Sequence, residues 1–207
     1  MAINIKAIIA DAFLALCDRK PMSKITIADI QQESGVSRQT FYNHFQDKFD
    51  LVQFIYEDRV ISLWKSPLDS NLNYYEATLS CFQSDAKYHK FIKQACKFGG
   101  TTDFQDFMYE HSRLFDRMWH QYIYGSTPLT EEMLFASDYY SGAKMRMQIN
   151  WIMEDMPISP EELLENCLRV RLFSLNELLF NGNDARSPYT KAANYIYSSL
   201  RPDGIKP

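Results

Sequence analysis

Residues 25–48 read ITIADIQQESGVSRQTFYNHFQDK, and this stretch decides the fold because it encodes two short helices joined by a tight turn. Thr26 can cap the first helix, and Asp29 stands three residues later in the position that completes a capping box. Gly35 can end this helix by adopting the left-handed backbone conformation. Ser37 can then cap the second helix. Each helix is therefore expected to have about two turns.

Helices this short are marginal in isolation, so they need a partner to pack against. The chain supplies one just before them, an apolar stripe at helical spacing formed by Ile5, Ile9, Ala12, Phe13, Leu16 and Cys17. This first helix is expected to end near Arg19 and Lys20, before Pro21. Three helices whose last two meet at a glycine turn form a helix-turn-helix, and its last helix usually reads the major groove.

The second short helix, predicted over residues 38–45, carries mostly hydrogen-bonding side chains. Phe41 and Phe45 are four apart and form its buried face. Glutamine and asparagine can pair with adenine, arginine can pair with guanine, and helix starts suit phosphate contacts. The expected DNA-binding residues are Thr26, Ser37, Arg38, Gln39, Thr40, Tyr42, Asn43, His44 and Lys48, the last of these at the start of a fourth helix from Asp47 to about Trp64. Taken alone, the same face could be a polar helix surface in contact with solvent.

These motifs together resemble the DNA-binding domain of the tetracycline-repressor (TetR) family over roughly residues 5–60. The segments 138–142, 151–152 and 159–162 resemble the C-terminal domain of the branch of that family that includes DhaS-like regulators of dihydroxyacetone kinase. The resemblance implies an all-helical homodimer that binds palindromic operator DNA and responds to a small molecule in its larger domain. Gln31 and Ser34 depart from the family pattern, which usually has alanine at both positions.

The composition agrees with an all-α protein, because glycine and proline together are only 15 of 207 residues and 46% of the chain is hydrophobic. The longest apolar run, residues 12–17, is far too short to span a membrane, so a cytoplasmic protein is expected. The four cysteines are far apart and are expected to be buried apolar residues rather than disulfide or zinc ligands. No cofactor is expected.

We expect a helix-turn-helix domain over residues 1–50, followed by a larger helical bundle over residues 51–207 that senses an effector and forms the dimer. One predicted helix, residues 103–124, bears an aromatic and methionine stripe that could line an effector pocket or could simply be core. The candidate pocket residues are Phe104, Phe107, Met108, His111, Phe115, Trp119 and Tyr122. Asp116 and His120 share a face at a spacing that metals use, but two ligands make no site, and no metal is expected.

Two later helices with wide apolar faces suit an intersubunit bundle, although they could also pair within one chain. The candidate dimer residues are Tyr139, Tyr140, Ala143, Met147, Trp151, Leu164, Leu168, Leu172, Leu175 and Leu179.

The sequence contains no G-x-S-x-G, H-E-x-x-H, P-loop or dinucleotide glycine motif, so an enzyme is not expected. We therefore expect a transcriptional regulator, a repressor, that binds double-stranded operator DNA as a homodimer under the control of an unidentified small molecule. The alternative is an adaptor or co-activator of the same fold that has lost DNA binding and acts through protein partners.

Overall fold

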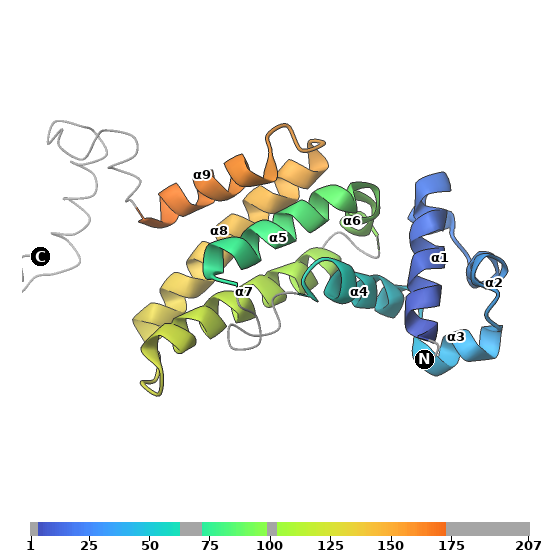
Figure 1. Ribbon diagram of the computed structural model, residues 1–207, viewed down its shortest axis with the longest axis horizontal. Coiled ribbons are helices and arrows are strands. Elements are labelled where there is room, and N and C mark those ends of the chain that lie inside the picture. The colour runs from blue at the N-terminus through green and yellow to red at the C-terminus, as the bar shows by residue number, and fades with distance from the viewer. Residues whose placement is uncertain (1–3, 63–71, 99–102, 173–207) are drawn as a thin grey trace, which may run out of the picture. The chain divides into compact units, whose positions relative to one another are not determined.

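The computed structural model describes residues 4–62, 72–98 and 103–172, and every regular element among them is helical, as the sequence predicts (Figure 1). The N-terminal elements are α1 (Ile5–Arg19), the 3-10 turn η1 (Met22–Lys24), α2 (Ile27–Ser34), α3 (Arg38–His44) and α4 (Lys48–Arg59). The later elements are α5 (Tyr74–Lys87), α6 (His89–Ala95), α7 (Asp103–Tyr124), α8 (Glu131–Met153) and α9 (Pro160–Leu172).

The chain divides after Leu164 into two compact units, Met1–Leu164 and Glu165–Pro207. Helices α1 to α8 belong to the first unit. α9 begins in the first unit, where Ser159 Oγ accepts a hydrogen bond from the Glu162 amide at 3.1 Å, and it runs into the second. Ser159 therefore caps this helix.

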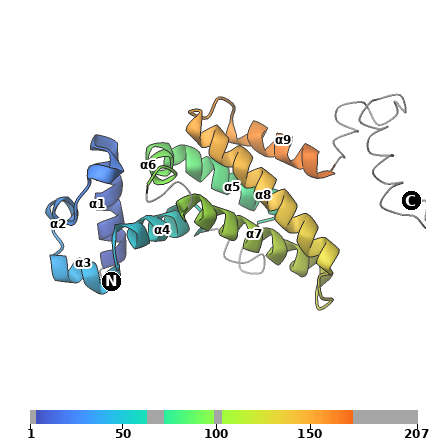
Figure 2. The ribbon, with the colours of Figure 1, turned by 180° about the vertical axis from the view of Figure 1, so that it is seen from behind.

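α1 is the support that the two short helices require. Its predicted stripe is buried from Ile9 onward, and Phe13 has no exposed surface. The helix ends at Arg19 as expected, because Lys20 adopts an extended conformation. Figures 1 and 2 show α2 and α3 beside α1, on the side away from α5.

α4 is shorter than the helix expected from Asp47 to about Trp64. It ends at Arg59, and the amides of Val60 and Ile61 both donate to the Tyr56 carbonyl, at 2.9 and 3.1 Å. The bond from Ile61 spans five residues, a π-type turn that is wider than an α-helical turn, and it ends the regular α-helical pattern. The sequence beyond this point has few breaking residues, so only the backbone geometry fixes the end of the helix.

The larger part of the first unit contains α5 to α8, of which α7 and α8 lie side by side in both views (Figures 1 and 2). At their crossing, a Cβ at Gly142 would lie 3.6 Å from the Tyr109 ring, an ordinary van der Waals contact, so Gly142 of α8 faces α7. Arg117 on α7 donates to both carboxylate oxygens of Asp138 on α8.

The short helix α6 joins the N-terminal helices to the rest of the unit. Gln94 Nε2 donates to the Cys17 carbonyl at 2.9 Å, and Gln94 Oε1 accepts from the Met22 amide. On the other side, Lys93 bonds Asp155, just after α8. One helix therefore contacts both α1 with η1 and the C-terminal end of α8.

The four cysteines are free and buried, as expected. None of the helices in the described part of the chain has the length and hydropathy that crossing a bilayer requires.

Candidate DNA-binding site

The turn between α2 and α3 is built by local interactions. Thr26 Oγ1 accepts from the Asp29 amide at 3.2 Å, and Asp29 Oδ2 accepts from the Thr26 amide at 2.7 Å. This is the predicted capping box. Gly35 has φ of 70°, the left-handed conformation predicted for it. A hydrogen bond from Lys20 contributes most to holding the pKa of Asp29 well below its ordinary range.

α3 is capped by Ser37, whose Oγ accepts from the Thr40 amide at 3.1 Å. The two hydroxyl groups of Ser37 and Thr40 are also 2.8 Å apart. Phe41 and Phe45 are 1% and 2% exposed, so they form the buried side of this segment as predicted. The last residue of α3 is His44, and Phe45, which was expected within the helix, is its C-cap residue. The burial of both rings fixes which side of α3 faces outward.

The outward side of α3 presents Arg38, Gln39, Tyr42 and Asn43, all of which are exposed. Gln39 Nε2 donates to Asn43 Oδ1 at 3.0 Å. The Arg38 guanidinium lies 5.7 Å from the centre of the Tyr42 ring. These contacts order two pairs of side chains on one surface. A hydrogen-bonding surface on a short helix of this kind has the chemistry of a base-reading face.

The other expected contact residues are placed less openly. His44 and Thr40 are half-buried, and Thr26 is exposed but engaged in its cap. Lys48 Nζ donates to the carbonyls of Met22 and Ile25, at 3.0 and 2.8 Å, and lies over the Phe98 ring. Burial lowers the pKa of the Lys48 ammonium. The structure therefore corrects the expectation for Lys48: it joins α4 to η1 and the residue after η1 instead of standing free for a phosphate.

Two other cations near this surface are in ion pairs. Arg19 pairs with Glu33 at 2.5 Å, and Lys20 pairs with Asp29 at 2.7 Å. Lys6 behaves differently, because its ammonium lies over the rings of Phe45 and Phe54, at 5.4 and 5.1 Å from their centres.

This contact puts an exposed cation beside the end of α3. Sequence reasoning missed Lys6, since it precedes that helix by more than thirty residues and no local pattern relates the two.

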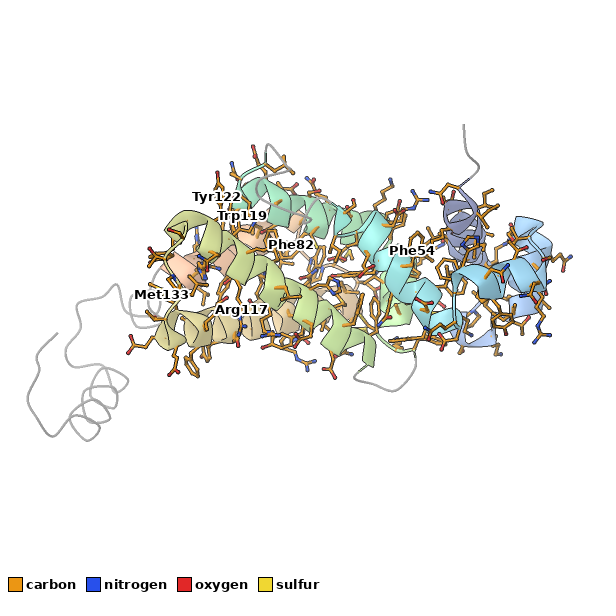
Figure 3. All side chains as sticks on the ribbon, turned by 90° about the horizontal axis from the view of Figure 1, so that it is seen from below. Phe54, Phe82, Arg117, Trp119, Tyr122 and Met133 are labelled. Atoms are coloured by element: carbon orange, nitrogen blue, oxygen red, sulfur yellow. The ribbon has the colours of Figure 1, made fainter. Side chains whose placement is uncertain are left out.

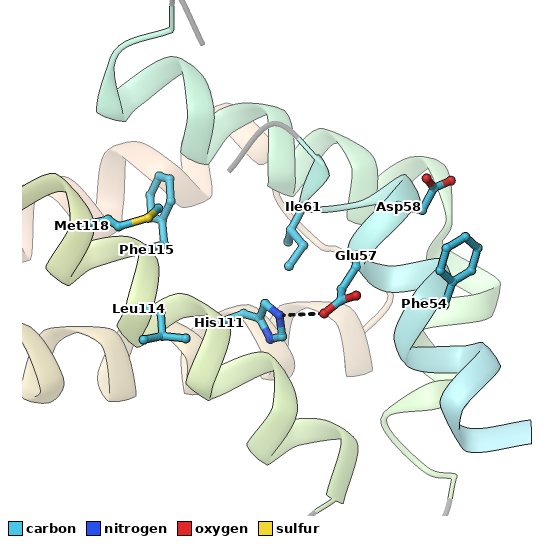
Figure 4. A pocket seen from close by; sticks show the side chains of 8 residues that line it. All are labelled: Phe54, Glu57, Asp58, Ile61, His111, Leu114, Phe115 and Met118. Carbon is cyan, nitrogen blue, oxygen red and sulfur yellow. Dashed lines mark hydrogen bonds and ion pairs between the residues drawn. The ribbon is translucent and has the colours of Figure 1, made fainter. Parts of the chain in front are cut away.

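A cavity of about 390 Å³ lies between α4 and α7, as Figure 4 shows. It is lined by Phe54, Glu57, Asp58, Ile61, His111, Leu114, Phe115 and Met118. His111 Nε2 lies 3.1 Å from Glu57 Oε1, and His111 Nδ1 lies 2.9 Å from the Phe107 carbonyl. Of the candidate pocket residues, His111 and Phe115 line this cavity. The α4 side was missed, because no spacing in the sequence relates Glu57 to His111.

The remaining candidate pocket residues pack elsewhere. Phe104 is 1% exposed against the Tyr56 ring, and Met108 Sδ lies 3.9 Å from Cys96 Sγ. Phe107 lies against His111, with ring centres 4.3 Å apart. Trp119 and Tyr122 lie against one another near the end of α7 (Figure 3). Tyr122 is 52% exposed. The stripe is therefore core for most of its length and lines the cavity only in the middle.

Polar residues are also buried between α5, α7 and α8. Asp116 accepts from the hydroxyl groups of Tyr74 and Ser137, at 3.0 and 2.7 Å. Asp85 has no exposed surface and accepts a hydrogen bond from Gln148. Within the described residues no cluster of histidine, cysteine, aspartate and glutamate could hold a metal ion.

One side of α8 is exposed and aromatic. Tyr139 is 74% exposed, Phe135 is 73% exposed and stacked on it, and Met147 is 49% exposed. Ala143 is exposed and Tyr140 half-buried on the same helix. Tyr139, Tyr140, Ala143 and Met147 were candidate dimer residues; Phe135 was not among them, although it lies four residues before Tyr139 at the same helical spacing.

Two candidate dimer residues are buried within their own chain. Trp151 is 3% exposed and its Nε1 donates to the Ile158 carbonyl at 2.8 Å, and Leu164 has no exposed surface. A side chain already buried in its own chain has no area to give to a subunit contact. Leu168 and Leu172 lie on α9, while Leu175 and Leu179 are outside the described residues.

Comparison with known proteins agrees with this arrangement. Residues 9–54 match the family model described as bacterial regulatory proteins, tetR family, and residues 73–171 match that of a transcriptional regulator C-terminal region. The dhaKLM operon transcriptional activator DhaS of Lactococcus lactis is 37% identical over 68 residues, covering 33% of this chain and 34% of that protein. The transcriptional regulator AlkX of Mycobacterium tuberculosis is 36% identical over 80 residues, covering 37% of this chain and 38% of that protein. The chain thus spans little more than a third of the length of these curated relatives.

Solved structures show the same fold over most of the chain. The dihydroxyacetone kinase operon activator DhaS aligns with a TM-score of 0.67 at 22% identity, covering 83% of this chain and 96% of that one. The fatty acid degradation regulator FadR of Bacillus halodurans aligns with a TM-score of 0.58 at 16% identity, covering 84% of this chain and 98% of that one.

Proposed function

The chain belongs to the TetR family of transcriptional regulators, which are DNA-binding proteins and not enzymes, and on that premise we propose that it is a cytoplasmic repressor. It binds a palindromic operator as a homodimer, and a small molecule bound in its larger domain changes its affinity for that operator. The observation that carries the proposal is the ordered, exposed face of α3 on a capped helix-turn-helix.

Arg38 is the residue to which we assign the base contact of greatest specificity. It is exposed on the first turn of α3, and the Tyr42 ring beside it restricts the orientation of its guanidinium. Arginine contacts guanine through two hydrogen bonds, and such a pair discriminates between bases by about 1–3 kcal/mol.

Gln39 and Asn43 act together in this proposal. Their mutual hydrogen bond uses one donor of Gln39 and one acceptor of Asn43, which leaves Gln39 Oε1 and the Asn43 amide group facing outward. This pairing of one acceptor with one donor complements the N6 donor and N7 acceptor of adenine.

Thr26, Ser37 and Thr40 lie at the starts of α2 and α3, where backbone amides favour phosphate. Lys6 adds a phosphate contact near the end of α3, where His44 also lies, and Lys48 is left out because its ammonium already has two carbonyl partners. Contacts of this type position the protein on the duplex without selecting a sequence.

The exposed aromatic side of α8 supports the homodimer. Phe135, Tyr139 and Met147 expose large apolar surface on a single helix, which is typical of an interaction site rather than of isolated surface residues. A symmetric dimer doubles the phosphate contacts, which a protein with a net charge of −4 needs, and it explains why the operator is a palindrome.

Control by a small molecule is supported by the cavity between α4 and α7 and by the contacts that join it to the reading helix. α4 carries three of the eight residues that line the cavity, and its first residue, Lys48, donates to the carbonyls of two residues that precede α2. Gln94 of α6 binds the last turn of α1 and the start of η1 through hydrogen bonds with the Cys17 carbonyl and the Met22 amide. The cavity is thus linked through α4 to the residues that immediately precede α2, which supports transmission of a change at the cavity toward the helix-turn-helix.

Repression is the simplest output, because a bound dimer needs only to occupy the promoter. The similar protein DhaS is named as an activator, so a co-activator that acts through a protein partner is the second candidate.

Selection of bound fragments from random duplex DNA tests the proposal. We expect enrichment of a palindrome whose half-sites are about one helical turn apart or slightly more. Arg38→Ala should weaken binding of that site by about 1–3 kcal/mol, whereas Arg146→Ala, on α8 and away from α3, should not. An unchanged affinity of the Arg38 variant would refute the assignment of that residue. A folded dimer that enriches no sequence at low salt would favour the co-activator.

A further inference from the structure

We propose that the cavity between α4 and α7 takes a small amphipathic cation, an ammonium group on an apolar or aromatic body, and that Glu57 binds its charge. The proposal rests on control of the protein by a small molecule and specifies the chemistry of that molecule. Figure 4 shows Glu57 of α4 and His111 of α7 joined across this space.

The walls of the cavity define the apolar part of the ligand. Two rings and three aliphatic or thioether side chains line it, namely Phe54, Ile61, Leu114, Phe115 and Met118. The volume of about 390 Å³ lies at the lower end of the range for ligand sites, roughly 300–1,000 Å³. A single substituted ring or a short alkyl chain fits this space better than a large polycyclic molecule.

The charged groups of the lining define the other part of the ligand. Among the residues that the structure describes, the lining contains the carboxylates of Glu57 and Asp58 and one imidazole, that of His111, but no lysine or arginine. Arg59 adjoins Asp58 at 3.3 Å, and it also binds Asp11 at 2.8 Å on the side of α1. The lining is therefore negative whether His111 is charged or neutral. An anionic ligand would be repelled, and a cation is complementary.

The contact between Glu57 and His111 is one that such a ligand can replace. Both ring nitrogens of His111 face acceptors, Nδ1 the Phe107 carbonyl and Nε2 the Glu57 carboxylate. A neutral imidazole has one N–H and can satisfy only one of them. An ammonium group carries three donors and can bond Glu57, while His111 keeps its bond to Phe107. The ligand thus removes the direct link between α4 and α7 at the point where it binds.

Three probes with the same body and different charge test the inference: 4-phenylbutylamine, 4-phenylbutan-1-ol and 4-phenylbutyrate. Binding to the full chain without DNA is measured by isothermal titration calorimetry at pH 7. We expect the amine to bind at least tenfold more tightly than the alcohol, and the carboxylate more weakly than both. The proposal would be overturned if the carboxylate bound more tightly than the amine, if all three probes bound equally, or if none of them bound.

Glu57→Gln separates charge from shape, because glutamine has the same size and can still accept from His111 Nε2. We expect it to weaken the amine at least tenfold and to leave the alcohol unchanged. Glu131→Gln, an exposed position at the start of α8, removes the same charge away from the cavity and should alter neither. An equal loss for amine and alcohol in the Glu57 variant would show that Glu57 only maintains the cavity and would overturn the assignment.

These measurements use no DNA, so they fail independently of the DNA selection. Amine binding without operator binding would refute the regulator and keep the cation site. Operator binding without amine preference would refute only the ligand chemistry.

Discussion

Asp85 is a carboxyl group with no exposed surface, and its ionisation should lower the stability of the fold as the pH rises from acid to neutral. Burial raises its pKa from 3.8 to about 7, against the opposing effect of the hydrogen bond from Gln148. The folded protein therefore binds more protons than the unfolded chain between these two pKa values. The contribution of Asp85 to the free energy of unfolding must then fall as the pH rises from about 4 to about 7, and stay level above that.

The size of this effect follows from the two pKa values. The loss of free energy of unfolding caused by ionisation of Asp85 is absent below about pH 4 and complete above about pH 7, where it reaches about 4 kcal/mol. Between pH 5 and pH 8 it changes by about 2.5 kcal/mol. Burial raises the pKa of Cys96 to about 12, and it raises the pKa of Tyr56 and of Cys81 well above the ordinary values. None of these neighbours titrates in the same interval.

Asp85→Asn tests the calculation, because asparagine has nearly the same shape and no charge. The asparagine amide group of the variant can accept from Gln148 Nε2 and donate to Gln148 Oε1. In the parent protein, with aspartate at this position, Gln148 Oε1 has no hydrogen-bond partner. We expect the variant to be more stable than the parent by about 4 kcal/mol at pH 8 and by about 1.5 kcal/mol at pH 5.

Urea unfolding followed by circular dichroism at pH 5, 6.5 and 8, at one protein concentration, measures the difference. Asp106→Asn, an exposed carboxylate on α7, is the matched control and should show a constant difference from the parent. Parallel pH profiles for the parent and the Asp85 variant would refute the reasoning, since they would mean that Asp85 is hydrated or shifted equally in both states.

Three further substitutions test single features of the fold. Ser37→Ala removes the acceptor of the Thr40 amide and should lower the free energy of unfolding by about 1 kcal/mol in urea, and no loss would mean that the cap contributes nothing. Gly35→Ala meets no atom within 4 Å, so its expected cost, about 1–2 kcal/mol in thermal unfolding, comes from the positive φ alone. Tyr139→Glu should leave the fold intact and give a monomer in sedimentation velocity, and an unchanged dimer would move the interface away from the exposed side of α8.

The sequence could predict the features whose partners lie within one helical turn. The capping box of Thr26 with Asp29, the left-handed Gly35 and the cap of Thr40 by Ser37 each depend on groups at most three residues apart. Residue type and spacing describe such interactions completely. For the same reason the helix expected over residues 103–124 is confirmed as α7, because its periodicity extends over many turns.

Groups that meet from distant parts of the chain depended on the tertiary structure. Periodicity shows that the helix containing Trp151 has apolar residues, but not whether they face this chain or a second one. The Trp151 indole is buried within this chain. It cannot show that Lys48 finds two carbonyls of another element, or that Glu57 meets His111 across a cavity. Helical spacing specifies only the direction in which a side chain points from the axis of its own helix. The packing of all the helices decides what that side chain meets.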